Sequence, residues 1–387
     1  MPAENKAFFL IDYSVTGGVE KVNANLSFLF QENNIDFKYI ISLYSSNEYP
    51  EINYASHLKL HVVNPISKRS LIESITKVLQ ENNITTILFQ GDNMTIALAV
   101  LKAAKNANCK AILHYHGSPY AYLKKYIFRV DLIKNPILIF TWLFSKIVYP
   151  FKKNKLKRVI QLAQDGFVCV SHGAEQEIKD LYNLNDYNSQ KISTIYNPLL
   201  FEKINNVNLF SEKEQIISFV SRLTHKHKNA MLIVKAWMLL ADKYSEWKLQ
   251  ILGDGPLKKI MESIFEKNNV QNVHFYGNVK NIEEKLIKSS IAVSTSNCEG
   301  FGLAMAEAAY FGNALVATKS DGGLKDIILE DQTGFFVPLN DGPSLALSIE
   351  KLILDHELCT KFGKNAQNRI SDLDFKNEII KWKKLLV

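Results

Sequence analysis

Two acidic and two basic side chains in the second half of the chain have types and spacing suited to a phosphorylated ligand. Glu299 and Glu307 stand eight positions apart, and Arg222 and Lys228 follow an apolar run further upstream. Eight residues of helix turn through about 800°, roughly 80° beyond two full turns, so both carboxylates can face one ligand at different depths. Cations at the carboxyl end of a strand are well placed to hold a diphosphate.

A glycine-loosened turn follows the first of these glutamates. Residues 290–295 predict a buried strand, residues 302–312 predict a helix rich in Ala, Leu and Met, and Gly-Phe-Gly occupies 300–302 between them. Unpaired N–H groups at a helix start attract anions, and glycines let that backbone approach a ligand closely. The sequence therefore predicts an anion site beside Glu299.

The elements that must position these residues are short apolar runs that alternate with amphipathic ones. Strands are predicted at 7–11, 37–42, 58–63, 85–89, 110–114 and 166–170, and again at 216–220, 248–252, 273–276, 291–294, 314–317 and 334–337. This alternation is typical of doubly wound parallel sheets, so an α/β fold of two Rossmann-like domains is predicted. Their boundary is expected within the polar stretch 197–214, and the site in the cleft that they face.

Size and composition fit a globular protein with an anionic partner. The chain has 387 residues, 47% hydrophobic and 22% charged, and a formal net charge of +7. Its four cysteines are scattered without a Cys-x-x-Cys pair, so we expect reduced thiols in a cytoplasmic protein. The first residues lack the basic start, apolar run and cleavage site of a signal peptide.

The glutamate pair and the basic run resemble the E-x7-E motif and the Arg…Lys signature of retaining glycosyltransferases with the GT-B fold, of the GT4 type (glycosyl transferases group 1). The resemblance covers nearly the whole chain, most firmly from about 218 to 334. It implies an acceptor-side domain at 1–200, a nucleotide-sugar-binding domain at 201–371, and a terminal helix at 372–387 that packs back on the first domain.

The resemblance also implies roles for individual residues. Glu299 would meet the donor sugar hydroxyls, Glu307 the ribose hydroxyls, and His116 the transferred sugar. Arg222 and Lys228 would hold the diphosphate, with Lys226 as the weaker alternative to Lys228. The remaining implied contacts of the nucleotide sugar are Gly17, Gly18, Gly253, Gly300, Phe301, Gly302 and Leu303. For the glycines at 17, 18 and 253 a plain turn is the alternative, and for His116 a structural role.

No metal and no separate cofactor is expected. His114 and His116 lie two apart on a predicted strand, but no carboxylate or cysteine stands nearby at ligand spacing. Asp372 and Asp374 spell Asp-x-Asp, which here more plausibly caps the terminal helix. Arg222 and Lys228 would replace the metal.

A basic and aromatic stretch between 120 and 158 lies outside these motifs. Its cations are Lys124, Lys125, Arg129, Lys134, Lys146, Lys152, Lys153, Lys155, Lys157 and Arg158. Its uncharged run, 135–145, is too short to span a bilayer, so the stretch predicts binding to an anionic membrane surface, on the inner face of the cell membrane. An ordinary core helix with a charged outer face is the alternative, and no motif supports a nucleic-acid partner.

The function predicted is therefore retaining, metal-independent transfer of a sugar from a nucleotide diphosphate sugar, a uridine diphosphate (UDP) sugar before a guanosine one. The acceptor would be a hydroxyl of a surface glycan, such as lipopolysaccharide or capsule, or of a lipid-linked intermediate. Two alternatives stay open. One is a nucleotide-sugar hydrolase or epimerase on the same scaffold, and the other is a catalytically silent GT-B protein that binds glycan beside a partner enzyme.

Overall fold

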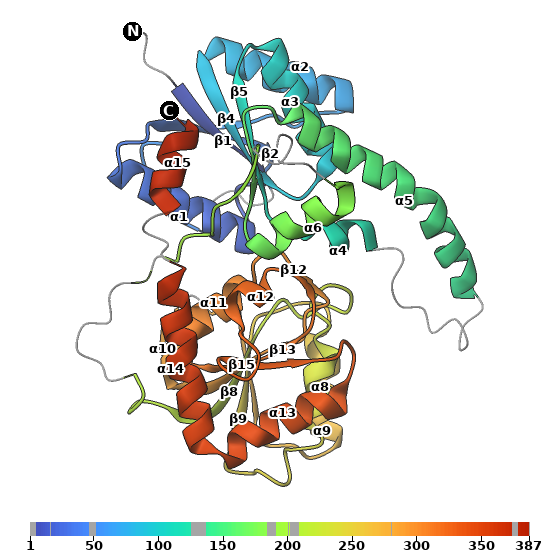
Figure 1. Ribbon diagram of the computed structural model, residues 1–387, viewed down its shortest axis with the longest axis vertical. Coiled ribbons are helices and arrows are strands. Elements are labelled where there is room, and N and C mark those ends of the chain that lie inside the picture. Colours follow the sequence, from blue (N-terminus) through green and yellow to red (C-terminus); the bar gives the residue numbers. More distant parts are fainter. Residues whose placement is uncertain are drawn as a thin grey trace. The chain divides into compact units, whose positions relative to one another are not determined.

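The computed structural model describes residues 5–15, 17–45, 52–124, 137–183, 191–199, 201, 209–279, 281–373 and 378–386, with the backbone alone at 124 and 137–146. The chain forms two compact units, 1–200 with 375–387, and 201–374. Each unit is a wholly parallel sheet with helices on its faces (Figure 1). We describe each unit by itself.

The first unit has a seven-stranded sheet in the order β3-β2-β1-β4-β5-β6-β7. Its strands are β1 (Asn5–Asp12), β2 (Phe37–Tyr44), β3 (Lys59–Val62), β4 (Ile84–Gly91), β5 (Lys110–Tyr115), β6 (Phe167–Cys169) and β7 (Ile192–Thr194). The six strands predicted for this half are confirmed. The sequence missed β7, because its residues Ile-Ser-Thr include only one apolar side chain and so form no apolar run.

Helices cover both faces of this sheet. They are α1 (Gly18–Glu32), α2 (Lys68–Glu81), α3 (Met94–Asn106), α4 (Pro119–Lys124), α5 (Ile137–Leu162), α6 (His172–Tyr182) and α15 (Glu378–Leu386). Residues of α2, α3 and α5 share one core with alternate strand residues such as Phe89 and Leu113. On the opposite face, Phe30 of α1 packs edge-on against Trp382 of α15, with ring centroids 5.7 Å apart.

The end of the chain differs from the sequence prediction. Asp372 is the last residue of α14 (His356–Asp372) and does not cap the terminal helix, which is described over Glu378–Leu386, and Asp374 lies outside the described residues. The terminal helix α15 belongs to the first unit, where Glu378 accepts a hydrogen bond from the Tyr196 N–H at 3.1 Å. Apolar spacing alone did not reveal where one helix stops and the next starts.

The second unit has a six-stranded sheet in the order β10-β9-β8-β11-β13-β15. These strands are β8 (Glu214–Val220), β9 (Lys248–Leu252), β10 (Val273–Gly277), β11 (Ser289–Ser294), β13 (Ala314–Thr318) and β15 (Gly334–Val337), and all six were predicted. A separate two-residue ladder pairs β12 (Cys298–Glu299) with β14 (Asp321–Gly322). Strands this short leave no periodic signal, so the sequence missed the ladder.

The helices of the second unit are α8 (Met231–Trp237), α9 (Lys258–Lys267), α10 (Ile282–Lys288), α11 (Leu303–Tyr310), α12 (Leu324–Ile327), α13 (Gly342–Leu354) and α14. Their apolar residues, such as Trp237 and Phe362, form one core with the strands. The start of α13 shows how the sequence sets a boundary. Asp341 accepts the Ser344 N–H at 2.9 Å, and proline occupies the first turn, where no N–H is needed.

Both sheets have the strand order of a Rossmann fold, in which the connections reverse direction beside the first strand. This switch lies between β1 and β4 in the first unit and between β8 and β11 in the second. Loops that leave the carboxyl ends of the two central strands diverge there, and ligands of such sheets bind at that point. The candidate residues of each unit follow these strands.

Candidate functional site

The loop that follows β8 carries Arg222 and rests directly on a glycine turn. The Ser221 N–H donates to the Leu252 carbonyl at 3.0 Å, and the Leu223 N–H donates to the Asp254 carbonyl at 2.9 Å. Gly253 has φ of +137°, and a Cβ there would lie 2.1 Å from the Ser221 carbonyl oxygen. Gly253 thus lets the turn support the backbone of Arg222, whose side chain is exposed. Direct nucleotide contact by Gly253 stays a prediction.

The centre of the site is an ion pair between the loops that follow β8 and β11. Lys228 Nζ lies 2.6 Å from Glu299 Oε1, and the Ser296 hydroxyl donates to the same oxygen at 2.5 Å. The Glu299 side chain is 14% exposed and that of Lys228 32%, so solvent screens the pair only in part. The sequence missed Ser296, although a run of Ser and Thr directly after a strand is a usable signal.

Further hydrogen bonds join these two loops. The Thr295 hydroxyl donates to the Lys228 carbonyl at 2.8 Å. The Asn297 side chain donates to the Lys226 carbonyl at 2.7 Å, and its N–H donates to the His227 carbonyl at 2.8 Å. The backbone on which Lys228 stands is therefore fixed against the strand end that carries Glu299. Lys228, and not Lys226, makes the contact with the glutamate.

The first turn of α11 lies directly after this pair. Gly302 precedes the helix with φ of +93°, and a Cβ there would lie 2.3 Å from Leu324 Cδ2, so only glycine fits. Phe301 is buried, so its side chain packs inside the unit and its backbone borders the turn. Leu303 opens the helix, where N–H groups lack intrahelical acceptors. This is the geometry expected of an anion site.

Glu307 lies inside α11 and is only 4% exposed. Sequence reasoning placed it a turn and a half into this helix, and the structure agrees. Its predicted contact with ribose hydroxyls stays a prediction, as do the predicted ligand contacts of the amides from Gly300 to Leu303.

The glycine pair of the first unit lies at the start of α1, after β1. Gly17 is the N-cap residue and has an extended conformation, with φ of −152°, which any amino acid can adopt. A Cβ on Gly18 would meet no described atom within 4 Å outside its neighbours in the chain. Neither strain nor packing within the described part of this unit requires glycine here. The space in front of this helix start is what a ligand would need.

A buried polar cluster ends β4 and β5 of the first unit. Gln90 Oε1 lies 2.7 Å from His114 Nδ1 and 2.7 Å from His116 Nε2. Burial lowers the pKa of His116 to about 3 and that of His114 well below its usual value, so both rings are neutral at pH 7. Sequence reasoning missed Gln90, a polar residue that closes an apolar strand. In the part of the chain that the structure describes, no three His, Cys, Asp or Glu side chains group as metal ligands.

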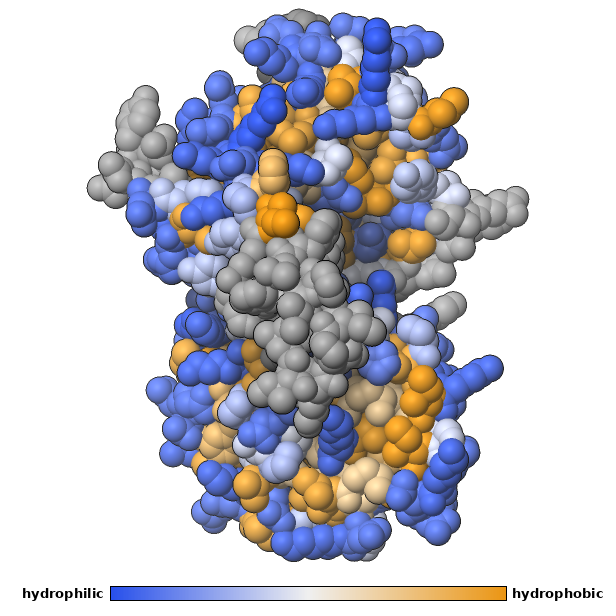
Figure 2. All heavy atoms as spheres, turned by 90° about the vertical axis from the view of Figure 1, so that its right-hand side faces the viewer, coloured by the Kyte–Doolittle hydropathy of each residue, from blue (hydrophilic) through white to orange (hydrophobic). Residues whose placement is uncertain are grey.

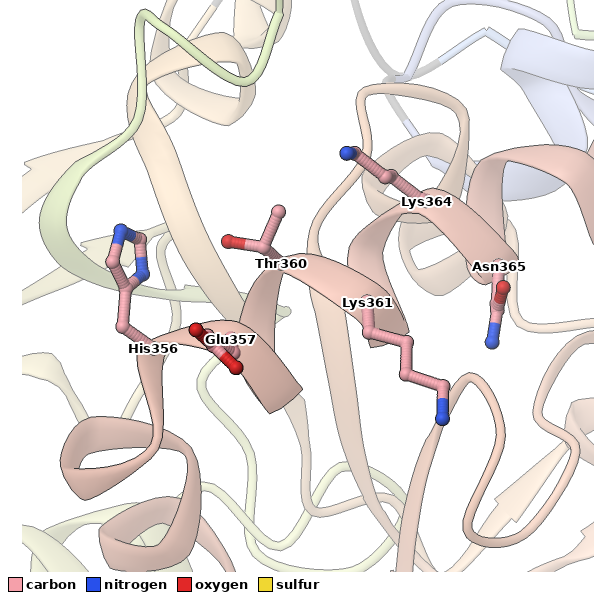
Figure 3. A pocket seen from close by; sticks show the side chains of 6 residues that line it. All are labelled: His356, Glu357, Thr360, Lys361, Lys364 and Asn365. Carbon is pink, nitrogen blue, oxygen red and sulfur yellow. The ribbon is translucent and has the colours of Figure 1, made fainter.

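A surface groove on the second unit is separate from these residues. Its lining side chains fan out along one helix, α14, and come from His356, Glu357, Thr360, Lys361, Lys364 and Asn365 (Figure 3). None of them follows a strand at the carboxyl edge of the sheet. The groove is therefore not part of the candidate site.

The basic and aromatic stretch coincides in part with α5, and its side chains from 124 to 146 lie outside the described residues. Three of its cations contact their own unit. Lys152 Nζ donates to the Tyr122 carbonyl at 3.3 Å, Lys153 lies over the Tyr182 ring at 5.6 Å, and Lys155 donates to the Thr95 hydroxyl at 3.1 Å. These three lysines are half-buried, so they present less charge to a membrane than the sequence suggested.

The exposed side of α5 is partly apolar. Ile147 is 62% exposed and Phe151 is 71% exposed, one helical turn apart. In the space-filling view, both units show hydrophilic residues with apolar residues among them (Figure 2). Single exposed apolar side chains are therefore ordinary. What distinguishes Ile147 and Phe151 is that they lie on one side of the same helix. None of the helices that the structure describes is long and apolar enough to cross a membrane.

The comparison with protein families decides what the second unit is. The model of the family described as glycosyl transferases group 1 matches residues 201–369. The second unit is a group 1 glycosyl transferase domain. Its Arg222, Lys228, Glu299 and Glu307 all fall within the matched range.

Relatives of this transferase domain act on bacterial glycans by name. The chain is 27% identical over 198 residues to the GalNAc-alpha-(1->4)-GalNAc-alpha-(1->3)-diNAcBac-PP-undecaprenol alpha-1,4-N-acetyl-D-galactosaminyltransferase of Campylobacter jejuni, covering 51% of this chain and 55% of that protein. It is 29% identical over 223 residues to the poly(ribitol-phosphate) alpha-N-acetylglucosaminyltransferase of Staphylococcus aureus, covering 57% of this chain and 43% of that protein. The matches span about half the length of these relatives.

A solved structure extends the similarity to both units. The crystal structure of a mutant of S. aureus TarM, in complex with fondaparinux, alpha-GlcNAc-glycerol and UDP, has a TM-score of 0.77 and covers 99% of this chain and 100% of that one, at 14% identity. Identity this low carries the fold alone. The predicted GT-B fold, with a Rossmann-like domain in each half, is confirmed.

Proposed function

We propose that this chain is a retaining glycosyltransferase that moves a sugar from a nucleotide diphosphate sugar to a hydroxyl of a glycan or lipid-linked acceptor. The observation that carries the proposal is the Lys228–Glu299 pair beside the first turn of α11, within a group 1 glycosyl transferase domain. A UDP sugar is the favoured donor, and the UDP in the similar TarM complex supports that choice.

In the proposed site the acidic and basic side chains bind different parts of the donor. Among the described residues, both partners of the Glu299 carboxylate bind Oε1, so Oε2 is available to a sugar hydroxyl. Arg222 is exposed and Lys228 half-buried, and both would bind diphosphate oxygens. As the sugar bond breaks, the leaving diphosphate gains negative charge, so fixed cations and helix-start amides stabilise the transition state more than the bound donor.

The transfer step needs no separate cofactor in this proposal. The bond between the anomeric carbon and the donor phosphate oxygen breaks, and its electron pair leaves with the nucleoside diphosphate. The acceptor oxygen bonds to the same carbon on the same face, and its proton passes to the leaving phosphate oxygen. Retention without a covalent intermediate follows from that same-face attack. For an alpha-linked donor, the alpha linkages in the names of both relatives support the retaining outcome.

The first unit would supply the acceptor side. Gly17 and Gly18 leave open backbone at the start of α1, and His116 presents a neutral ring at the end of β5. Neutral hydrogen-bonding groups suit hydroxyl-rich ligands, whose groups both donate and accept. The relatives' glycan and polyprenol-linked substrates support an acceptor of this kind.

Attachment to an anionic membrane surface, with the protein in the cytoplasm, is part of the proposal and rests on the exposed side of α5. Ile147 and Phe151 would enter the headgroup region, with Lys157 and Arg158 beside the lipid phosphates. Replacing Ile147 and Phe151 by Ser should reduce sedimentation with vesicles of anionic lipid more than replacing Lys152, Lys153 and Lys155 by Gln. Equal sedimentation of the wild type with neutral and anionic vesicles would contradict the electrostatic part.

A donor screen tests the proposal as a whole. Thermal unfolding is measured with a panel of UDP and GDP sugars, because a ligand that binds only the folded chain raises the melting temperature. The best donor is then incubated with lipid-linked and glycan acceptors, and product and free UDP are both measured. Transfer to an acceptor supports the proposal. Release of UDP without any acceptor would favour the hydrolase, and conversion of the donor into a second UDP sugar would favour the epimerase. No stabilisation by any donor would favour a silent glycan-binding protein.

A further inference from the structure

One side chain holds both imidazoles of the first unit. Gln90 is the penultimate residue of β4, and its neighbour in the sheet register is His114 on β5. Because side chains alternate along a strand, His114 and His116 lie on the same face, with ring centroids 4.3 Å apart. Gln90 Oε1 lies at 2.7 Å from a nitrogen of each ring. One carbonyl oxygen has two lone pairs, so it can accept from both N–H groups at once.

The cluster is not arranged for stability. Gln90 and His114 are 1% and 0% exposed, so both side chains are buried inside the unit. Among the described residues, Gln90 Nε2 is buried without a hydrogen-bond partner. Buried polar atoms without partners cost free energy that an apolar residue at this position would not. What the arrangement does provide is a fixed orientation for His116, which is only half-buried at the end of the strand.

A third contact holds the cluster from behind. Trp382 of α15 meets the His114 ring edge-on, with centroids 5.1 Å apart and planes at 84°. Trp382 is 1% exposed, so this packing is rigid. His114 therefore cannot turn without displacing the terminal helix, and it fixes the position of the Gln90 amide in turn.

We propose that Gln90 is a positioning residue that fixes the ring and the tautomer of His116, with the proton on Nε2 and the lone pair of Nδ1 presented to a donor or acceptor hydroxyl. The Gln90 oxygen accepts the Nε2–H, so Nδ1 is the ring atom left to meet a ligand. Neutral rings are what the burial of both histidines dictates. The inference rests on the proposed function only for the identity of the ligand.

The tautomer is measured directly by nitrogen-15 NMR of the full chain labelled at histidine, at pH 7 and without substrate. The expected spectrum shows His116 with its proton on Nε2 and Nδ1 unprotonated. A proton on Nδ1, or a doubly protonated ring, would overturn the proposal. Because no substrate is present, this result stands even if the proposed transferase activity fails.

Variants separate positioning from a structural role. Gln90→Leu removes the acceptor, so the His116 signals should shift to mixed tautomers and kcat/KM should fall roughly five- to tenfold, the scale of one neutral hydrogen bond. Gln90→Glu restores an acceptor of the same shape. Its carboxylate raises the pKa of His116 and favours the charged ring, which would appear as a new protonation step in the pH profile.

A matched control lies on the same strand. Thr86 is 4% exposed and shares the face of Gln90, four residues earlier on β4. Thr86→Val should leave the His116 signals and kcat/KM unchanged. Equal losses in Thr86→Val and Gln90→Leu would show that any buried polar change disturbs the unit, which would contradict the positioning role. If Gln90→Leu fails to fold, Gln90→Glu and the wild-type spectrum decide the question.

Discussion

The two units share a strand order but differ in the chemistry at the carboxyl edge of their sheets. In the second unit the loops after the two central strands meet in a charged pair, Lys228 and Glu299. In the first unit strands β4 and β5 end in neutral groups, with Gln90 between two uncharged imidazoles. The difference teaches that the scaffold sets where a ligand binds, while the first few residues of each loop set what binds.

The glycines of the two units differ in the same way. Gly253 and Gly302 have positive φ, and their Cβ positions are filled by Ser221 and Leu324. The charged loops of the second unit are thus fixed by packing before any ligand arrives. Gly18 of the first unit has open space beside it, and packing within the described part of the unit does not require it. A pre-organised site suits a charged donor, because fixed charges need no reorganisation as the reaction proceeds.

The largest effect is expected from Glu299→Gln, which removes the negative charge of the Lys228–Glu299 pair in the second unit. It removes the partner of Lys228 and the proposed sugar contact, and each charge-assisted hydrogen bond is worth about 1.5–3 kcal/mol. Transfer measured as kcat/KM should fall roughly 100-fold or more. Glu350→Gln is the matched control, because Glu350 and Lys243 also lie 2.6 Å apart but Lys243 precedes β9, at the amino end of the sheet. Equal activity of the two variants would contradict the assignment.

Arg222→Ala should have the next largest effect, on donor binding. The side chain is exposed on a loop whose backbone is fixed by the Gly253 turn, so its loss removes a charge without moving the loop. We expect the free energy of UDP binding, measured by calorimetry, to weaken by about 1.5–3 kcal/mol. The dissociation constant for UDP should therefore rise roughly 10- to 150-fold. Arg222→Ala should leave the affinity for uridine unchanged, because uridine lacks the diphosphate. Unchanged UDP affinity would remove Arg222 from the site.

A pair of glycine substitutions compares how the two units hold their loops. Gly253→Ala should lower the free energy of unfolding by roughly 1–3 kcal/mol, because its Cβ would collide with the Ser221 carbonyl. Gly18→Ala should leave that free energy within about 1 kcal/mol, since alanine is the better helix former and meets open space. Urea unfolding measures both. A larger loss from Gly18→Ala than from Gly253→Ala would refute the contrast.

The smallest effect concerns buried titratable groups. Lys213 of the second unit donates to the carbonyls of Leu286, Ser289 and Phe311 at 3.2, 2.7 and 2.7 Å, and burial lowers its pKa from 10.5 to about 7. Between those values the unfolded chain holds a proton that the folded chain has released. The free energy of unfolding should therefore rise with pH, by up to about 1.4 kcal/mol per pH unit.

Urea unfolding at pH 7.5 and 8.5 checks this sign. Lys213→Met should lose the rise, and the exposed Lys259→Met should keep it. The buried histidines of the first unit affect stability at acid pH. Burial lowers the pKa of His116 from 6.5 to about 3, so between these values the unfolded chain binds a proton that the folded chain does not. The free energy of unfolding therefore falls as the pH drops through that range. A flat wild-type profile between pH 7.5 and 8.5 would contradict the lowered pKa of Lys213.

Much of the fold followed from the sequence, because buried parallel strands are continuous apolar runs between turn signals. Twelve strands were predicted from such runs, whereas β7 has only one apolar residue and β12 and β14 have only two residues each. The residues of the charged pair were predicted from their positions after strands β8 and β11. Their contact with each other was not, because it depends on which strands are neighbours.

The sequence analysis also did not predict two polar residues that support the site. Ser296 and Gln90 act through hydrogen bonds to functional side chains. A lone Gln carries no signal of that role in one sequence, whereas Ser296 belongs to a run of Ser and Thr directly after a strand. The cations of α5 show the reverse error. The sequence counted Lys152, Lys153 and Lys155 as free charge, but a helix turns some of its side chains toward its own unit.

The central claim is that the second unit binds the diphosphate of a nucleotide sugar at the edge formed by Lys228, Glu299 and the start of α11. Hydrogen–deuterium exchange of the full chain, with and without UDP, tests it most directly. The account predicts slower exchange in peptides that cover 221–229 and 297–308, and in Arg222→Ala the same protection only at a roughly 10- to 150-fold higher UDP concentration. Protection confined to other segments, or none at saturating UDP, would contradict it.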